Sequence, residues 1–140
     1  MNREELSLRV LQLRTSLNIS KYKVAKLSGL AELQIGRIDN ATHSYSIDNL
    51  FKYLNAIPAV IKLYSTQYNK SYILQSRQDF VAAFKEIRLM SGLSQVKAAN
   101  IIGVNSAIIT GIESRDVDTS IDKFLQCIYG LGYQIKIAKL

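Results

Sequence analysis

Apolar residues recur every three or four positions through the first seventeen residues of the chain, which is the spacing of one face of a helix. Asn2 precedes this stretch and Glu5 follows three residues later, the spacing of a helix-capping box. Shorter segments with the same period begin at Ser20, after Gly29 and at Ser46, so four helices are predicted. Their predicted inward-facing residues are Leu6, Val10, Leu13 and Leu17, then Val24, Ala25 and Leu27, then Ile35 and Ile38, and finally Ile47, Leu50, Phe51 and Leu54.

The period changes from helical spacing to alternation after the fourth helix. The segment "AVIKLYS" at 59–65 alternates in the way typical of a strand. We expect a turn near 67–70 and a second strand at 71–76. The C-terminal "YQIKIAKL" alternates too, and because a hairpin alone is marginally stable, it is expected to add a third strand. The predicted fold class is therefore mainly α, with a small antiparallel sheet.

The chain repeats itself with an offset of 74 residues. Residues 14–63 align with residues 88–137 without a gap, and twelve positions are identical. The identical pairs are Arg14/Arg88, Ser20/Ser94, Lys23/Lys97, Ala25/Ala99, Gly29/Gly103, Ile35/Ile109, Ile38/Ile112, Ser46/Ser120, Ile47/Ile121, Asp48/Asp122, Ile61/Ile135 and Lys62/Lys136. We predict two copies of one unit, at 1–66 and 78–140, with a bridge at 67–77 that contributes a hairpin strand. Pairing of the strands that follow each unit would hold the copies together.

The net charge of +7 is shared by both halves, as expected if both meet one polyanion; charge that serves only solubility is the alternative. The single cysteine, Cys127, lies among apolar helix residues and is predicted to be a buried hydrophobic residue. It cannot form an internal disulfide, which favours a reducing, cytoplasmic location. No apolar run is long enough for a membrane span, and the N-terminus does not have the pattern of a signal peptide.

Enzymatic chemistry is not expected from this sequence. The only histidine, His43, precedes the fourth helix, and no histidine lies near Cys127 in the chain. We find no metal-ligand pairs, no glycine-rich phosphate loop and no nucleophile elbow. No cofactor and no metal are therefore expected.

The segment Ser94–Glu113, "SQVKAANIIGVNSAIITGIE", resembles the Xre or lambda-repressor-like helix-turn-helix family. Its Ser-Gln opens a helix, a glycine occupies the turn, and isoleucines are spaced through a second helix that ends in Glu. The first copy, Ser20–Asp39, is similar, but Lys21 stands where Gln is usual and Asp39 where Glu is usual. The resemblance implies two tandem lambda-repressor-like helix-turn-helix units.

The same resemblance implies a DNA-binding role for the second and third helix of each unit. In the family, the third helix lies in the major groove and the second crosses the backbone. The base-reading candidates are Glu32, Gln34 and Arg37 in the first copy and Asn105, Ser106 and Thr110 in the second. The phosphate-contacting candidates are Lys21, Lys23, Lys26, Gln95 and Lys97. Arg37 is the strongest base reader, because a guanidinium can form two hydrogen bonds with guanine.

The two predicted reading helices carry different residues. Gly111 takes the place of Arg37, and Ile108 takes the place of Gln34. Asn105 could cap a helix instead of reading a base, and Ala107 could touch a thymine methyl group or a protein. Such a single-chain pseudo-dimer is expected to prefer an asymmetric site, with half-site centres about 34 Å apart.

The predicted function is thus that of a sequence-specific double-stranded DNA-binding protein, a transcriptional regulator that acts as a single-chain pseudo-dimer. The alternative is an antitoxin or protein-interaction module, with a toxin or another protein as its partner and a degenerate second reading helix. The apolar residues Ala107 and Ile108, and the bridge tyrosines Tyr64, Tyr68 and Tyr72, favour this alternative. Exchange of strands between two chains would give a homodimer, and this too is left open. No membrane partner is expected.

Overall fold

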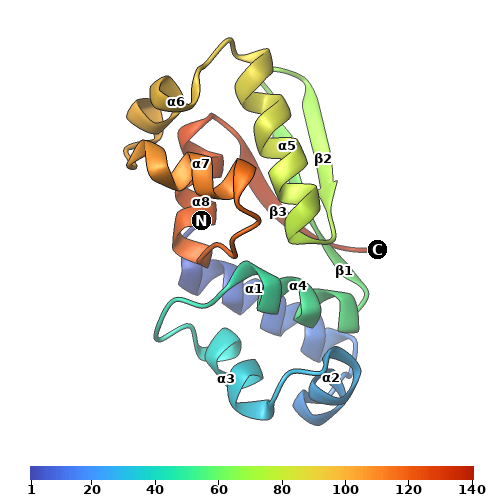
Figure 1. Ribbon diagram of the computed structural model, residues 1–140. Coiled ribbons are helices and arrows are strands. Elements are labelled where there is room, and N and C mark those ends of the chain that lie inside the picture. The colour runs from blue at the N-terminus through green and yellow to red at the C-terminus, as the bar shows by residue number, and fades with distance from the viewer.

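The computed structural model describes all 140 residues and contains eight helices and three strands. In chain order the elements are α1 (Arg3–Ser16), α2 (Lys21–Ser28), α3 (Glu32–Asn40), α4 (Ile47–Ala56), β1 (Ala59–Ser65), β2 (Lys70–Leu74), α5 (Arg77–Met90), α6 (Gln95–Ile102), α7 (Ser106–Ser114), α8 (Ile121–Gly130) and β3 (Gln134–Lys139). In Figure 1 the helices of the first half lie below those of the second half, and the strands run along one side. The predicted class, mainly helical with a small antiparallel sheet, is confirmed.

The sequence repeat is also a repeat of structure. The bounds of α1 to α4 return 74 residues later, residue for residue, as those of α5 to α8. The cap residues repeat as well, because short polar side chains accept a backbone N–H at the first turn of each helix. The serine caps are Ser20 and Ser46 in the first half and Ser94 and Ser120 in the second; Asn2 and Ser76 cap α1 and α5.

The three strands form one antiparallel sheet in the order β2-β1-β3, so the C-terminal strand pairs with β1 as predicted. Strand β2 runs from Lys70 to Leu74 and is shorter than the predicted 71–76. It ends early because Ser76 caps α5 and Gln75 donates its backbone N–H to Asp79, which turns the chain away from the sheet. The turn before β2 is at residues 66–69, with Asn69 in the left-handed region at φ 48°.

One hydrophobic core of 35 buried residues extends through both halves. Its centre in the second half is aromatic: the ring of Phe80 lies 5.8 Å from that of Phe84 and 4.8 Å from that of Phe124. Cys127 is fully buried, as predicted, and burial raises the pKa of its thiol to about 12. The boundaries predicted at 66 and 78 thus separate repeated segments that share a single core, and α5 already begins at Arg77.

One predicted inward-facing residue is exposed. The apolar spacing of α2 predicts that Leu27 faces inward, but Leu27 is 59% exposed, and Val24 is the buried residue of this short helix. Ile108, which takes the place of Gln34 in the second copy, is half-buried and packs against the core. None of the eight helices combines the length and the apolar character that crossing a membrane requires.

Candidate nucleic-acid interface

Each half contains a buried arginine that fixes the relative positions of its first three helices. In the first half, Arg14 of α1 donates to Asp39 of α3 at 3.0 Å and to the carbonyl of Ile19, just before α2, at 3.0 Å. Arg14 also donates to the hydroxyl of Tyr53 on α4 at 2.7 Å, and that hydroxyl donates to Asp39 at 2.6 Å. A buried charge is tolerated only when it is paired in this way, so the network sets where α3 lies.

The second half has the same arrangement with different partners. Arg88 forms two hydrogen bonds with the carboxylate of Glu113 on α7, both 2.7 Å long, and donates to the carbonyl of Leu93 at 2.9 Å. Cys127 occupies the place of the first-half tyrosine and cannot take its role, and the longer glutamate instead meets the guanidinium with both oxygens. These bonds to Glu113 raise the pKa of Arg88 above its ordinary value against the opposing effect of burial.

A short connection joins the second and third helix in each half. Gly29 ends α2 in the left-handed conformation at φ 78°, and Gly103 ends α6 at φ 88°. Glycine adopts this conformation without the steric cost that a side chain brings, and the chain can then turn sharply into the next helix. Two short helices joined by the predicted glycine turn therefore lie on the surface of each half.

The candidate base-reading residues of α3 differ in how free they are. Arg37 is exposed, and no hydrogen bond or ion pair within the chain engages its guanidinium; Glu32 is likewise exposed and unpaired. Gln34 is half-buried, and its side-chain oxygen accepts the backbone N–H of Ala31 at 2.9 Å, so it caps α3. Arg37 and Glu32 are thus the long polar side chains of this helix that can reach an external partner.

The side chains of Asn105 and Thr110, two of the candidate residues of the second copy, form hydrogen bonds within the chain. Asn105 caps the helix by accepting the N–H of Ala107 at 2.9 Å. The hydroxyl of Thr110 lies 3.0 Å from the side-chain oxygen of Gln95, and the amide of Gln95 in turn approaches Glu113 at 3.4 Å. Ser106 is half-buried at the start of the helix, and its carbonyl oxygen lies 3.2 Å from the Thr110 hydroxyl. The second copy therefore presents fewer free polar groups than the first.

The candidate phosphate-contacting lysines are all exposed and free. Lys21, Lys23 and Lys26 line α2, and Lys97 lies on α6. Every ion pair in the protein is formed by an arginine, and no lysine takes part in one. The ammonium group of Lys21 lies close to Gly36 of α3. A Cβ atom added at Gly36 would be 3.0 Å from the Lys21 Nζ. The α2 lysines and Arg37 thus form a basic surface on one unit.

The two halves meet through contacts that are reciprocal. Ser46 pairs with Ser120 as an isolated antiparallel bridge, and Lys62 of β1 pairs with Lys136 of β3; each pair joins residues 74 positions apart. The backbone N–H of Ile47 donates to Thr119, and that of Ile121 donates to Tyr45, which is the same bond made in the opposite direction. Such reciprocity is the property of a two-fold interface, here formed within one chain.

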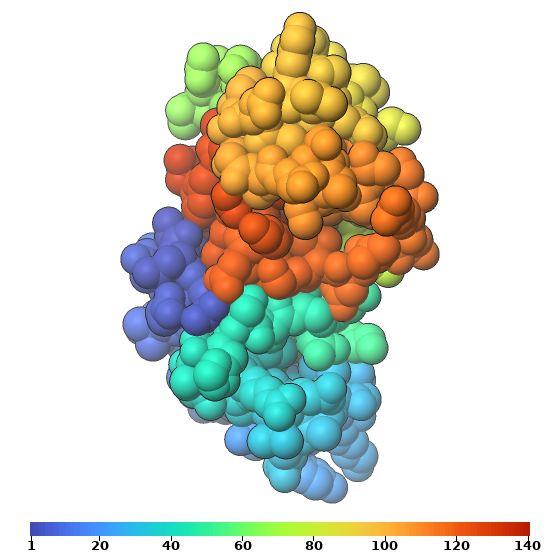
Figure 2. All heavy atoms as spheres, turned by 60° about the vertical axis from the view of Figure 1, so that its left-hand side comes forward, coloured from blue at the N-terminus to red at the C-terminus, as the bar shows by residue number.

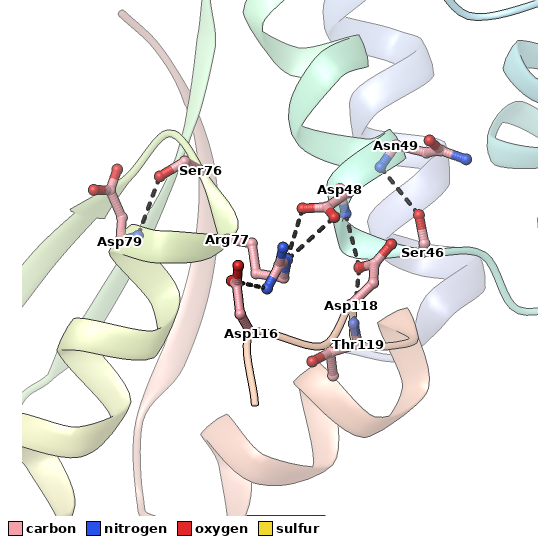
Figure 3. Close-up of polar contacts among 9 residues, drawn as sticks. All are labelled: Ser46, Asp48, Asn49, Ser76, Arg77, Asp79, Asp116, Asp118 and Thr119. Carbon is pink, nitrogen blue, oxygen red and sulfur yellow. Dashed lines mark hydrogen bonds and ion pairs between the residues drawn. The ribbon is translucent and has the colours of Figure 1, made fainter. Parts of the chain in front are cut away.

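Arginines repeat this reciprocity at the joint. Arg3 donates to Asp122 at 2.5 Å, and Arg77 donates with its Nε to both oxygens of Asp48 at 3.0 and 3.1 Å. Arg77 also reaches Asp116 at 2.7 Å, and Figure 3 shows its guanidinium between the two carboxylates. Burial acts to lower the pKa of Arg77, but the bonds to Asp116 and Asp48 outweigh it, so the pKa is raised and the charge is retained.

The joint gives a testable difference between the two arginines. Arg77→Met is expected to lower the free energy of unfolding by about 1–3 kcal/mol, because hydrogen bonds to charged groups are lost from a side chain that is only 10% exposed. Arg3→Met is the matched control; it breaks the equivalent pair at a site that is 19% exposed, and its cost should be smaller. Urea denaturation measures both. An equal or larger loss in the Arg3 variant would show that burial does not set the strength of these pairs.

The reciprocal contacts leave α3 and α7 on the same side of the protein. In Figure 1 both helices lie on the side away from the strands, and Figure 2 shows the cyan α3 segment below the orange α7 segment on one face. Neither helix is enclosed by the core; α3 buries Ile35 and Ile38, and α7 buries Ile109 and Ile112. The helices singled out from the sequence are thus brought together on a common surface.

The structure also exposes large apolar side chains that the sequence analysis did not single out. On α2 and α6 these are Tyr22, Val96 and Ile101, with exposed fractions of 67%, 59% and 57%. Leu33 at the start of α3 is 67% exposed. A short helix needs to bury only two or three apolar residues, and these helices carry more than that. This excess was the sequence signal that could have indicated exposed apolar side chains.

A hollow of about 250 Å³ lies beside α7. Its lining includes Ala107, Ile108, Gly111 and Val117, together with the basic residues Arg115 and Lys123. No group of three or more His, Cys, Asp or Glu side chains is placed to hold a metal ion.

Comparisons with protein-family models, with curated proteins and with solved structures give no match for this chain.

Proposed function

We propose that this protein binds double-stranded DNA as a single-chain pseudo-dimer and acts as a transcriptional regulator, with α2–α3 and α6–α7 as two lambda-repressor-like helix-turn-helix units. The observation that carries the proposal is the reciprocal joint, which leaves α3 and α7 on one face of the molecule. Two-fold dimers of this class place their third helices in successive turns of the major groove. A reducing, cytoplasmic location belongs to the same proposal.

Arg37 carries the base-reading part of the proposal. Its guanidinium is exposed and unpaired, so it can form two hydrogen bonds with the O6 and N7 atoms of guanine without first breaking a bond within the protein. Glu32, one turn earlier on α3, is also free and could accept from the amino group of cytosine. Gln34 is assigned to capping α3 and has a lesser part in recognition.

The lysines carry the sequence-independent part. Lys21, Lys23 and Lys26 on α2 and Lys97 on α6 have no partner within the chain, so phosphate contacts cost them no ion pair. Lys21 lies over α3, at the place where the phosphates that flank the groove would pass. These contacts fix the register of the protein on the duplex and release counterions.

The two halves should contribute unequally. Asn105, Thr110 and Gln95 are held by hydrogen bonds within the second half, and Gly111 stands where the first half has its exposed arginine. We therefore propose that α3 reads sequence while α7 contributes backbone and apolar contacts. The operator would be asymmetric, with half-sites about 34 Å apart.

A second candidate function is a protein-interaction module or antitoxin. The exposed Tyr22, Leu33, Val96 and Ile101 favour it, because apolar side chains on short surface helices are suited to a protein partner. These residues belong to the same helices that carry the basic groups, so one surface could serve either function. The Arg37→Ala variant distinguishes the DNA-binding function from the protein-interaction function.

Arg37→Ala is expected to weaken binding to a selected operator by about 1–3 kcal/mol, with little change in binding to random duplex. The operator comes from selection of bound duplexes from a random library, which also tests its asymmetry. Arg9→Ala on α1 removes the same charge from an exposed arginine and is the matched control. Equal losses on both duplexes would remove Arg37 from the reading role, and absence of any selected duplex would overturn the DNA-binding proposal.

A further inference from the structure

The outward face of the three-stranded sheet carries a basic hollow that the DNA-binding proposal does not use. It has a volume of about 440 Å³ and is lined by Lys62, Tyr64, Ser65, Thr66, Asn69, Lys70, Ser71 and Lys136. In Figure 1 the strands lie on the side of the molecule away from α3 and α7. A volume of this size is within the range of small-molecule sites.

Like charges are concentrated in this hollow. Lys62 and Lys136 are directly opposite one another in the register of β1 and β3. Side chains in that relation have Cβ atoms about 4.5–5.5 Å apart, and like charges there destabilise a sheet. None of the lining residues is acidic, and neither Lys62 nor Lys136 forms an ion pair. Lys70 also lines the hollow, but it is opposite Ser65 in the register, which assigns its side chain to the other face of the sheet. Lys62 and Lys136 thus repel one another, and a bound anion would remove this repulsion.

The neighbouring groups are suited to phosphate oxygens. Hydroxyls of Tyr64, Thr66 and Ser71 and the amide of Asn69 have no hydrogen-bond partner within the chain, so they can donate to a ligand. Ammonium groups together with hydroxyl and amide donors are the groups that recognise phosphate.

We propose that this hollow binds a small phosphate-bearing anion, such as pyrophosphate or a nucleoside diphosphate. The two ammonium groups of Lys62 and Lys136 match the charge of about −1.5 to −2 that a phosphate group carries at pH 7. Lys62 and Lys136 are equivalent residues of the two halves, so the ligand lies across the strand pair that joins them. Its binding therefore strengthens the joint between the two units.

Calorimetric titration with pyrophosphate, and separately with ADP, tests the site. We expect one ligand per chain, a higher unfolding temperature with ligand, and an affinity reduced about tenfold or more in Lys62→Gln and Lys136→Gln. Equal affinity for the two probes would assign recognition to the phosphates alone, and tighter binding of ADP would assign the site to a nucleotide. Lys52→Gln, an exposed lysine on α4 outside the hollow, is the matched control.

Three results would overturn the proposal: no binding of either probe at millimolar concentration, an equal loss in the Lys52 variant, or displacement of the probe by a short duplex. The last would show that the anion occupies the DNA surface. The lysine variants without ligand should unfold at the same or a higher temperature than the original protein, since each removes a like-charge contact. A lower temperature would show that these lysines stabilise the empty sheet and would contradict the argument.

Discussion

Arg88→Ala is expected to lower the free energy of unfolding by about 3–5 kcal/mol, because it leaves a buried carboxylate without its partner. The side chain of Glu113 is only 2% exposed, and both of its oxygens are bound by Arg88 at 2.7 Å. The carbonyl of Leu93 would lose its donor as well. These losses fall on the contact that positions α7, so the whole second half should be affected.

Urea denaturation measures this effect, and Arg115→Ala is the matched control. Arg115 is an exposed arginine that follows α7, and its removal should change stability by less than about 0.5 kcal/mol. Combining Arg88→Met with Glu113→Leu should restore most of the loss, because apolar side chains can replace a buried ion pair at little cost. A loss below 1 kcal/mol for Arg88→Ala, or no recovery in the double variant, would contradict a buried, uncompensated charge.

The equivalent substitution in the first half, Arg14→Ala, should lower the free energy of unfolding by a smaller amount. In Arg14→Ala the carboxylate of Asp39 still accepts the hydroxyl of Tyr53 at 2.6 Å, and its side chain is 15% exposed. The tyrosine therefore provides compensation that Cys127 cannot provide in the second half, where the Gln95 amide, 3.4 Å from the carboxylate of Glu113, is the donor that remains. This comparison uses one protein to separate the effect of an orphaned charge from the loss of an arginine.

Affinity for the duplex should fall about 10³-fold between 50 and 200 mM salt if the protein contacts about six phosphates. The reason is counterion release, since each lysine–phosphate contact frees a condensed cation from the DNA. Fluorescence anisotropy of a labelled duplex over a range of salt concentrations measures the slope. Lys21→Gln combined with Lys23→Gln should reduce that slope by about two.

The control for the salt experiment is Lys85→Gln combined with Lys139→Gln, which removes the same charge from exposed positions away from α2. Its slope should equal that of the original protein. No measurable binding to the duplex at the lowest salt concentration would favour the protein-interaction function, because an apolar contact through Tyr22, Leu33 and Val96 does not require a phosphate. An equal change of slope in both double variants would remove Lys21 and Lys23 from the interface.

Much of the architecture could be predicted from the chain because local signals agree with one another. Ser20, Gly29 and Ser46 begin or end helices where capping chemistry requires it, and the structure places them there. The offset of 74 residues gave the second set of helices without further argument. Periodicity alone was wrong for Leu27, which fits the apolar face of α2 but is exposed, because in this helix of eight residues only Val24 is fully buried.

The candidate site was less predictable, because a side chain's availability depends on distant residues. Arg37 and Gln34 looked alike as polar residues of one helix, but only the structure shows that Gln34 caps α3 while Arg37 is free. Thr110 was a candidate for the same reason, and it is held by Gln95 from the preceding helix. The Gln34 bond has the three-residue spacing of a capping box, which is a local signal, whereas the Thr110 bond joins residues 15 positions apart on two helices and depends on how those helices pack.

The sequence by itself determined the helices, the strands and the duplication, because helix caps, apolar period and repeat are properties of neighbouring residues. The tertiary structure alone decided how the two copies meet, since the pairing of Lys62 with Lys136 and of Arg77 with Asp48 depends on long-range packing. It also decided that α3 and α7 share one face and that Lys62 and Lys136 lie together on the outward face of the sheet. Local composition fixes each element, whereas the direction in which an element faces follows from the burial of the whole core.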